Sequence, residues 1–447
     1  MDRILITNAT IVNEGVRIPG DLYVKNGRIE AIGGDLSGRP YDRLIDAEGH
    51  YLLPGLIDDQ VHFREPGLTS KGDIRSESTA AVAGGVTSYM EMPNTLPPTL
   101  SKDRLDEKLA IAAESSVANY GFYLGASNDN LEEVKALDPG DACGVKIFMG
   151  ASTGNMLVDD PGILDGIFAS SPVLIATHCE DTPTILSNEA EFRRRYGDQV
   201  PARCHAEIRS REACFRSSSL AVELAKRHKA RLHLLHLTTQ EELNLLSDAP
   251  MEDKSITAEV CVHHLFFDAA DYEEKGHLIK CNPSIKTASD REALRTALID
   301  NRIDVIATDH APHCLSEKIR SYFDAPSGLP LVQHALLVLM TLVHQGTVSL
   351  ELIVAKACHA PARLFDIRDR GFIREGYWAD LVLVDPSAVT TVSTGQLFYR
   401  CGWSPFEGVV FPARISATLV SGQIAYRNSR IEGPCRGVRL EYDRSRR

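Results

Sequence analysis

The sequence predicts an α/β fold: a closed, TIM-like (β/α)₈ barrel beside a small β-sandwich domain that the N- and C-terminal segments form together. Two observations favour this architecture. Short apolar runs alternate with amphipathic stretches over about 270 residues, as expected for eight βα units. Segments rich in β-branched residues precede and follow this region. The length of 447 residues, with 43% hydrophobic and 24% charged residues, suits one large and one small domain.

The N-terminal segment, residues 1–53, has the pattern of β structure. Residues 4–12 are rich in β-branched side chains, which favour strands. Two alternating runs flank Asn26 and Gly27, a dipeptide that favours a tight hairpin turn. Because no candidate catalytic residues cluster here, we assign this segment to the small β domain.

Residues 54–365 are predicted to form the catalytic barrel. The apolar runs that predict its strands are 56–61, 86–91, 119–124, 144–148, 173–177, 231–237, 256–262 and 304–308. Amphipathic periodicity predicts helices at 73–83, 102–114, 210–228 and 289–299. A doubly wound open sheet is the alternative, but no glycine-rich phosphate-binding turn follows any of these strands.

The chain after the eighth strand returns to β structure. Residues 314–330 form a long connection, and loops of this length are usually functional or mobile. Helical patterns follow at 331–344 and 350–364, then a strand pattern at 379–385. A hairpin pattern at 417–424 turns at Ser421 and Gly422. We assign residues 366–447 to the small β domain and a charged tail.

Charge and cysteine usage limit the class of protein. The net charge of −13 argues against nucleic acid or an anionic membrane as the main partner, although a local arginine can still bind an anionic substrate. The ten cysteines are scattered singly, which is typical of reduced thiols. Neither a signal peptide nor a run of the roughly 20 apolar residues that span a membrane is visible. We expect a cytoplasmic protein that acts on a small molecule.

Polar residues at the predicted strand ends are the candidate site, because the carboxyl ends of barrel strands meet at one rim. His62 and Arg64 lie at the end of the first strand. His178 and His236 end the fifth and sixth strands, and Asp309 ends the eighth. Imidazole and carboxylate groups suit Zn²⁺, which activates a coordinated water at neutral pH. We therefore predict a hydrolytic reaction.

Other residues in these strands complicate the choice. The sixth strand also offers His233, and the seventh ends in His263 and His264. We choose His236 because it lies nearer the carboxyl end of its strand. The fourth strand carries Lys146 in an apolar run, where an unpaired ammonium is costly and must be neutralised, paired or modified.

Several motifs taken together resemble a known family. They are residues 54–57, His-Phe-Arg-Glu-Pro-Gly at 62–67, Met-Pro-Asn-Thr at 92–95, Lys-Ile-Phe-Met-Gly-Ala-Ser-Thr-Gly-Asn-Met at 146–156, Ala-Thr-Asp-His-Ala-Pro-His at 307–313, and the strand at 379–385. Over nearly its whole length the chain resembles the amidohydrolase superfamily and, within it, the dihydroorotase family. Members of that family interconvert carbamoyl-aspartate and dihydroorotate in pyrimidine biosynthesis.

The resemblance implies a role for each residue. The implied zinc ligands are His62, Lys146, His178, His236 and Asp309, with Lys146 carboxylated by CO₂ so that it could bridge two metals. The implied substrate contacts are Arg64, Asn94 and His313, for the α-carboxylate, and Asn282, near the substrate ring. Asp309 would also transfer the proton from the attacking water to the leaving nitrogen. Residues 314–330 would close over the site, and we expect a homodimer.

One residue departs from the family pattern. The family has His-x-His at the end of the first strand, and here Gln60 occupies the first position. A carboxamide oxygen is neutral and a poorer zinc ligand than imidazole. We therefore predict one tightly bound zinc at Lys146, His178 and His236, and a second metal near His62 and Asp309 that is weaker or absent.

Two rival functions are open. A dihydropyrimidinase, hydantoinase or allantoinase acts on a cyclic amide without the α-carboxylate, so Arg64 and Asn94 would lack a partner there. Alternatively, some chains similar to dihydroorotase are non-catalytic scaffolds for aspartate transcarbamoylase. The loss of a metal ligand at Gln60 fits a scaffold, whereas the intact remaining ligands and carboxylate contacts fit an enzyme.

Overall fold

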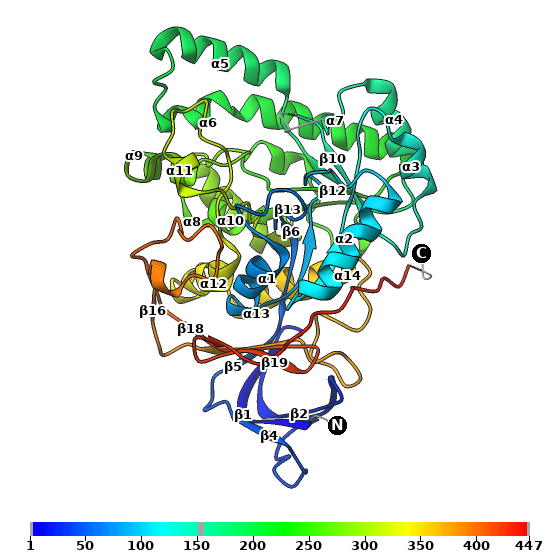
Figure 1. The fold of residues 1–447 in the computed structure, drawn as a ribbon, viewed down its shortest axis with the longest axis vertical. Coiled ribbons are helices and arrows are strands. Elements are labelled where there is room, and N and C mark those ends of the chain that lie inside the picture. The colour runs from blue at the N-terminus through cyan, green and yellow to red at the C-terminus, as the bar shows by residue number, and fades with distance from the viewer. Residues whose placement is uncertain (1–2, 151–155, 445–447) are drawn as a thin grey trace.

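The computed structural model describes residues 3–150 and 156–444, and it confirms the predicted fold class. A barrel of parallel strands forms the upper part of the molecule in Figure 1, and a mostly antiparallel sheet, called the antiparallel sheet below, lies beneath it. Residues 151–155, which belong to the motif at 146–156, lie outside the described residues, as do 1–2 and 445–447.

The strands of the barrel follow one another around a ring. Their bounds are β6 (Leu56–Val61), β7 (Val86–Glu91), β8 (Asn119–Phe122), β9 (Leu124–Gly125), β10 (Val145–Phe148), β11 (Ile175–His178), β12 (Leu232–Leu234), β13 (Ile256–Cys261) and β14 (Val305–Ala307). Each strand pairs in parallel with the next one along the chain, from β6 through β8 and again from β9 through β14. β8 and β9 are two parts of one predicted strand, interrupted at Tyr123, whose hydroxyl donates to the Asp59 carbonyl. A bridge between Val61 and His310 closes the ring.

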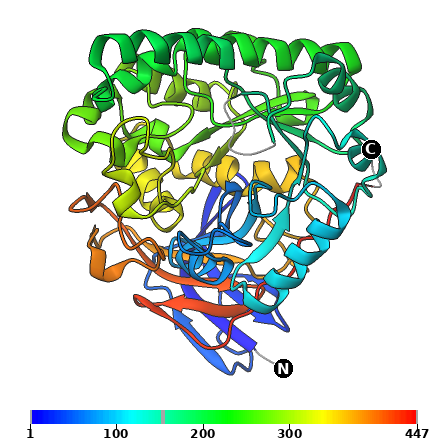
Figure 2. The same cartoon turned by 45° about the horizontal axis from the view of Figure 1, so that its top comes forward.

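Helices cover the outside of the barrel. They are α1 (Ile74–Ala83), α2 (Lys102–Ser115), α3 (Leu131–Ala136), α4 (Pro161–Ser170), α5 (Thr182–Tyr196), α6 (His205–Ile208), α7 (Arg211–His228), α8 (Val262–Phe266), α9 (Tyr272–Lys275), α10 (Ala288–Ile299), α11 (Leu315–Lys318), α12 (Ala335–His344), α13 (Leu350–Val354) and α14 (Ala360–Leu364). The four helices predicted from periodicity are confirmed to within a residue or two. Asp73 and Ser210 cap α1 and α7 by accepting free backbone N–H groups. Figure 2 shows α5 and α7 crossing the side of the barrel away from the antiparallel sheet.

The antiparallel sheet joins the two ends of the chain. Its strands are β1 (Arg3–Asn13), β2 (Val16–Lys25), β3 (Arg28–Gly33), β4 (Arg43–Asp46), β5 (Tyr51–Pro54), β15 (Leu381–Asp385), β18 (Arg414–Val420), β19 (Gln423–Arg427) and β20 (Arg430–Ile431). β5 pairs with β15, which links the N-terminal to the C-terminal strands. Both predicted hairpins are confirmed, with Lys25 opposite Arg28 and Val420 opposite Gln423. The domain limits at 53/54 and 365/366 stay predictions.

The connection at 314–330 is ordered by two buried lysines. Lys318, on α11, donates from Nζ to the carbonyls of Lys280, Pro326 and Gly328, each at 2.9 Å. Lys280 donates in turn to the carbonyls of Tyr322 and Ala325, at 2.5 and 2.7 Å. The long connection is thus fixed against the barrel from inside.

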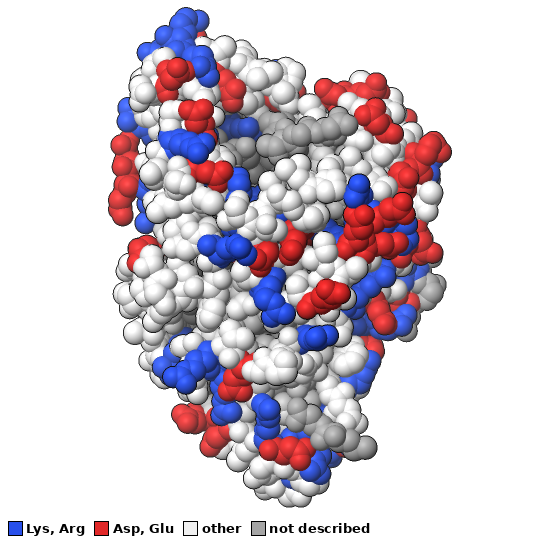
Figure 3. Space-filling view, in the orientation of Figure 1, with Lys and Arg blue, Asp and Glu red and all other residues white. Residues whose placement is uncertain are grey.

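The surface carries charges of both signs. Acidic and basic side chains are intermingled over the face shown in Figure 3. All ten cysteines lie in the described part of the chain, and each is a free thiol. Among the helices in residues 3–150 and 156–444, none combines the length and the apolar character needed to cross a membrane.

Candidate active site

A cavity of about 270 Å³ opens at the carboxyl ends of the barrel strands. All nine residues predicted from the sequence border it: His62, Arg64, Asn94, Lys146, His178, His236, Asn282, Asp309 and His313. Gln60, Phe148, Arg209, Ala311 and residues 326–328 complete its wall. The choice of His236 agrees with this geometry, because His233, His263 and His264 are buried away from the cavity wall.

Three of these residues lie beyond the strand ends in turns with a left-handed backbone. Arg64, His236 and Asp309 have φ values of 72°, 40° and 50°. The strands end earlier than predicted, β12 at Leu234 and β14 at Ala307. A left-handed backbone costs a non-glycine residue roughly 1–2 kcal/mol, so the surroundings must hold each turn.

Buried carboxylates hold two of these turns. Glu259 Oε1 accepts the backbone N–H of His236 at 3.0 Å. Asp58 accepts both the N–H and the hydroxyl of Thr308, at 3.1 and 2.6 Å, directly before Asp309. Each carboxylate satisfies a main-chain donor that no regular strand pairing serves.

A group of donor atoms converges on one side of the cavity. Nδ1 of His178 lies 3.0 Å from Nε2 of His236. Lys146 is 1% exposed, and its Nζ has no hydrogen-bond partner among the described residues. Burial lowers the pKa of Lys146 to about 8, so a larger share of this lysine is a neutral amine than of an exposed lysine. Burial also lowers the pKa of both histidines, which keeps their rings neutral.

A second group of donors lies on β6 and after β14. Nε2 of His62 lies 3.1 Å from Asp309 Oδ1, and Nδ1 lies 2.7 Å from Asn94 Oδ1. The Asn94 oxygen can only accept, so Nδ1 carries the proton and Nε2 presents its lone pair. Gln60 donates from Nε2 to Asp309 Oδ1 at 3.2 Å, and its buried Oε1 has no partner in the described part of the chain.

These two groups of donor atoms suit the zinc ion that the family resemblance implies. Neutral imidazole nitrogens, a carboxylate and an unpartnered buried lysine stand together, and the second ring nitrogens of His62 and His178 are fixed by hydrogen bonds. Uncompensated lone pairs of this kind are costly inside a protein unless a cation or a proton joins them.

A basic group faces the other side of the cavity. Arg64 is buried, and none of the described carboxylates forms an ion pair with it. Its guanidinium donates to the Pro312 carbonyl at 3.1 Å and lies 3.0 Å from His313 Nε2. Lys71 Nζ lies 3.1 Å from His313 Nδ1. Burial, with Arg64 and Lys71 nearby, lowers the pKa of His313 well below its usual value.

Arg209 and Glu180 belong to the site but were not predicted. Glu180 is fully buried and accepts from His178 Nε2 at 3.1 Å and from Arg209 at 2.5 Å. Burial acts to raise the pKa of Glu180, but Arg209 and His178 outweigh it and lower that pKa to about 2. The only sequence indication was that Glu180 stands two residues after His178.

Asn282 borders the cavity, but its amide is engaged by the protein. In the orientation that satisfies its hydrogen bonds, its oxygen accepts from Arg209 at 3.1 Å. Its nitrogen donates to Ser327 Oγ and to the Cys281 carbonyl, both at 3.0 Å.

Below the cavity lies a buried charged cluster. Nε2 of His233 lies 3.2 Å from Asp59 and 3.5 Å from Glu259. Burial acts to lower the pKa of His233, but the two carboxylates outweigh burial and raise it to about 9. His233 thus lies beside Glu259, the residue whose carboxyl group holds His236.

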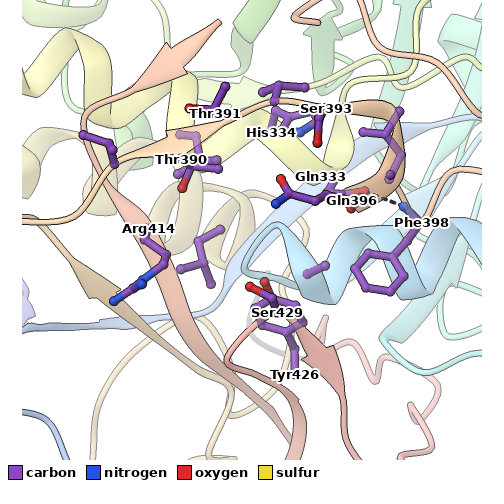
Figure 4. A pocket seen from close by; sticks show the side chains of 17 residues that line it. Gln333, His334, Thr390, Thr391, Ser393, Gln396, Phe398, Arg414, Tyr426 and Ser429 are labelled. Atoms are coloured by element: carbon purple, nitrogen blue, oxygen red, sulfur yellow. Dashed lines mark hydrogen bonds between the residues drawn. The ribbon is translucent and has the colours of Figure 1, made fainter. Parts of the chain in front are cut away.

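A larger cavity, of about 520 Å³, lies between helix α12 and the antiparallel sheet (Figure 4). Its wall includes Gln333, His334, Arg414 and Tyr426. Arg414 is the one charged side chain among the described residues of this wall, and it donates to Asp385 at 2.9 Å. None of the nine predicted site residues borders it.

Known proteins share this architecture. The amidohydrolase family matches residues 51–425. A dihydroorotase from Halobacterium salinarum is 36% identical over 423 residues, which cover 94% of this chain and 95% of the relative. An allantoinase from Bacillus velezensis is 29% identical over 431 residues, 95% of this chain and 94% of the relative. The solved structure of an L-hydantoinase from Arthrobacter aurescens has a TM-score of 0.92 at 27% identity and covers 99% of this chain and 100% of the hydantoinase.

The barrel, the sheet and the rim of histidines are the features of a class of hydrolases that generally bind a metal. The chain belongs to the amidohydrolase family. The predicted resemblance to dihydroorotases is also confirmed, since relatives that match nearly the whole chain at 32–36% identity carry that name.

Proposed function

We propose that this protein is a dihydroorotase, which interconverts N-carbamoyl-L-aspartate and L-dihydroorotate. The observation that carries the proposal is Arg64, a buried guanidinium beside His313 with no carboxylate partner among the described residues. Burial lowers the pKa of Arg64 to about 10, so the group is charged at neutral pH. A buried charge without a partner is costly, and a substrate carboxylate would supply that partner.

Arg64, Asn94 and His313 would bind the α-carboxylate of the substrate. The guanidinium offers a planar fork that matches a carboxylate, and the free amide nitrogen of Asn94 adds a donor. The positive charge of Arg64 would let this cavity bind an anion although the net charge of the protein is −13.

His62, Lys146, His178, His236 and Asp309 would hold zinc, with Lys146 carboxylated by CO₂. When bound, the metal polarises the ring amide carbonyl and lowers the pKa of a water. We propose one tightly held zinc at Lys146, His178 and His236, because those donors converge, whereas Gln60 presents only a neutral amide near His62 and Asp309.

Asp309 would move the proton. Its carboxylate borders the cavity, accepts from Gln60 Nε2 at 3.2 Å and lies 3.1 Å from His62 Nε2. In the hydrolytic direction Asp309 would accept a proton from the attacking water and deliver it to the departing ring nitrogen. In the biosynthetic direction the same carboxylate would take the proton from the ureido nitrogen as the ring closes and water leaves.

The experiment is an assay of purified protein with zinc, dihydroorotate and carbamoyl-aspartate, with the Lys146→Ala variant as control. Turnover in both directions that the variant lacks supports the proposal. No turnover above the variant would instead favour a non-catalytic scaffold for aspartate transcarbamoylase. Faster turnover of hydantoin or allantoin than of dihydroorotate would favour the relatives with those names. A homodimer in the cytoplasm stays our prediction for its assembly and location.

A further inference from the structure

Hydrogen bonds connect the long loop above the cavity to a predicted metal ligand. The loop residue Ser327 accepts from the Asn282 amide nitrogen at 3.0 Å, and the Asn282 oxygen accepts from Arg209 at 3.1 Å. Arg209 donates from its other terminal nitrogen to Glu180 at 2.5 Å. Glu180 accepts from His178 Nε2 at 3.1 Å.

Arg209 is the branch point of this series, and its fork shape makes both contacts possible. One terminal nitrogen faces Glu180 and the other faces Asn282, so a single rigid plane fixes two partners. Arg209 lies directly before the capping residue Ser210 of α7, and its own carbonyl accepts from Ser284 at 3.0 Å. Its backbone is therefore anchored independently of the cavity.

The orientation of His178 depends on this arrangement. Glu180 is an acceptor, so the proton of His178 lies on Nε2, and Nδ1 presents its lone pair toward His236. Groups that orient a ligand histidine in this way usually change metal affinity about 10- to 100-fold when they are removed. Without Arg209, Glu180 would be a buried carboxylate without its cationic partner. Keeping it charged and in place beside His178 would then cost more free energy.

We propose that Arg209 is a positioning residue that couples the loop at 314–330 to the metal ligand His178. Contact of Ser327 with Asn282 keeps the guanidinium plane in place, and that plane keeps Glu180 on His178. The proposal rests on the proposed zinc site. It adds that zinc retention depends on a loop residue that neither ligates the metal nor needs to contact the substrate.

The test is the rate of zinc release to a chromogenic chelator from the zinc-loaded, full-length protein. Arg209→Lys keeps the charge but loses the fork, and we expect release about 10-fold faster or more. Ser327→Ala removes one neutral hydrogen bond, and we expect a rise of about 3- to 10-fold. The matched controls are Arg203→Lys, an exposed arginine close by, and Ser321→Ala, which removes a hydroxyl that donates to Asp324 on the loop surface. Both controls should release zinc like the wild type.

Each of the following results would contradict the proposal. Unchanged release in Arg209→Lys together with a raised KM would make Arg209 a substrate contact instead. Faster release in Arg209→Lys but not in Ser327→Ala would show that the loop is not coupled to His178. A wild-type protein that retains no zinc would refute the proposed function itself, which separates that failure from this one. Amide hydrogen exchange of the metal-free variants confirms that the barrel is folded in each case.

Discussion

Nδ1 of His178 faces Nε2 of His236 at 3.0 Å, while the opposite nitrogen of His178 lies 3.1 Å from Glu180. Because Glu180 fixes the proton of His178 on the far side, the two imidazoles turn ligand atoms toward the same point. Nδ1 of His236 has no partner among the described residues, so no hydrogen bond at Nδ1 holds that ring in another orientation. The arrangement favours a metal ion between the two rings.

Glu180 should contribute stability that depends on pH. Its folded pKa, about 2, lies below the unfolded value near 4.5, so its contribution is present above pH 4.5 and is lost as the pH falls toward 2. A shift of this size corresponds to about 3 kcal/mol. We expect metal-free Glu180→Gln to unfold at lower urea than the wild type at pH 7, with the difference shrinking between pH 4.5 and pH 3. The exposed Glu132→Gln should match the wild type throughout, and a difference for Glu180→Gln that is as large at pH 3 as at pH 7 would refute this assignment.

Gln60 should set the number of metals. Purified wild-type protein should hold one zinc per chain after dialysis against a weak chelator. Gln60→His supplies the missing imidazole beside His62 and should raise the content toward two. Gln60→Ala should stay at one. Elemental analysis gives the count, and two tightly held zincs in the wild type would contradict the prediction.

Lys318 should hold the loop over the cavity. Replacing it with methionine leaves three buried carbonyls without their donor, and each costs about 1–3 kcal/mol. We expect faster amide hydrogen exchange in residues 314–330 and a higher KM in Lys318→Met. Lys275→Met is the control, because its ammonium contacts Glu274 at 3.8 Å and the Phe267 ring, neither of which belongs to the loop. Exchange in the loop that stays at the wild-type rate would show that these contacts are dispensable.

The sequence predicts the barrel and the rim well because both depend on local periodicity. Apolar runs identify the strands to within a few residues, and the strand-end rule then brings together side chains as distant as His62 and Asp309. All nine predicted residues border one cavity. Their chemical roles are predictions that await the experiments above.

Other features depend on tertiary packing, and the sequence did not indicate them. Arg209 follows a short helix rather than a strand, so no rule of barrel architecture points to it. The left-handed turn at His236 requires Glu259, a residue from the next strand, to accept its N–H. The family resemblance implies that Asn282 lies near the substrate ring, and in the structure Arg209 and Ser327 engage its amide.

The fourth prediction concerns the substrate and tests most directly whether the cavity binds dihydroorotate. 5,6-Dihydrouracil is dihydroorotate without its carboxylate, so the ratio of kcat/KM for the two rings measures what the carboxylate contributes. We expect the wild type to favour dihydroorotate by at least about 30-fold, since a buried arginine–carboxylate contact is worth about 2–5 kcal/mol. Arg64→Gln should lose most of that preference through its effect on dihydroorotate alone. A wild-type ratio near one, or a ratio that Arg64→Gln leaves unchanged, would contradict the assignment of this cavity to dihydroorotate.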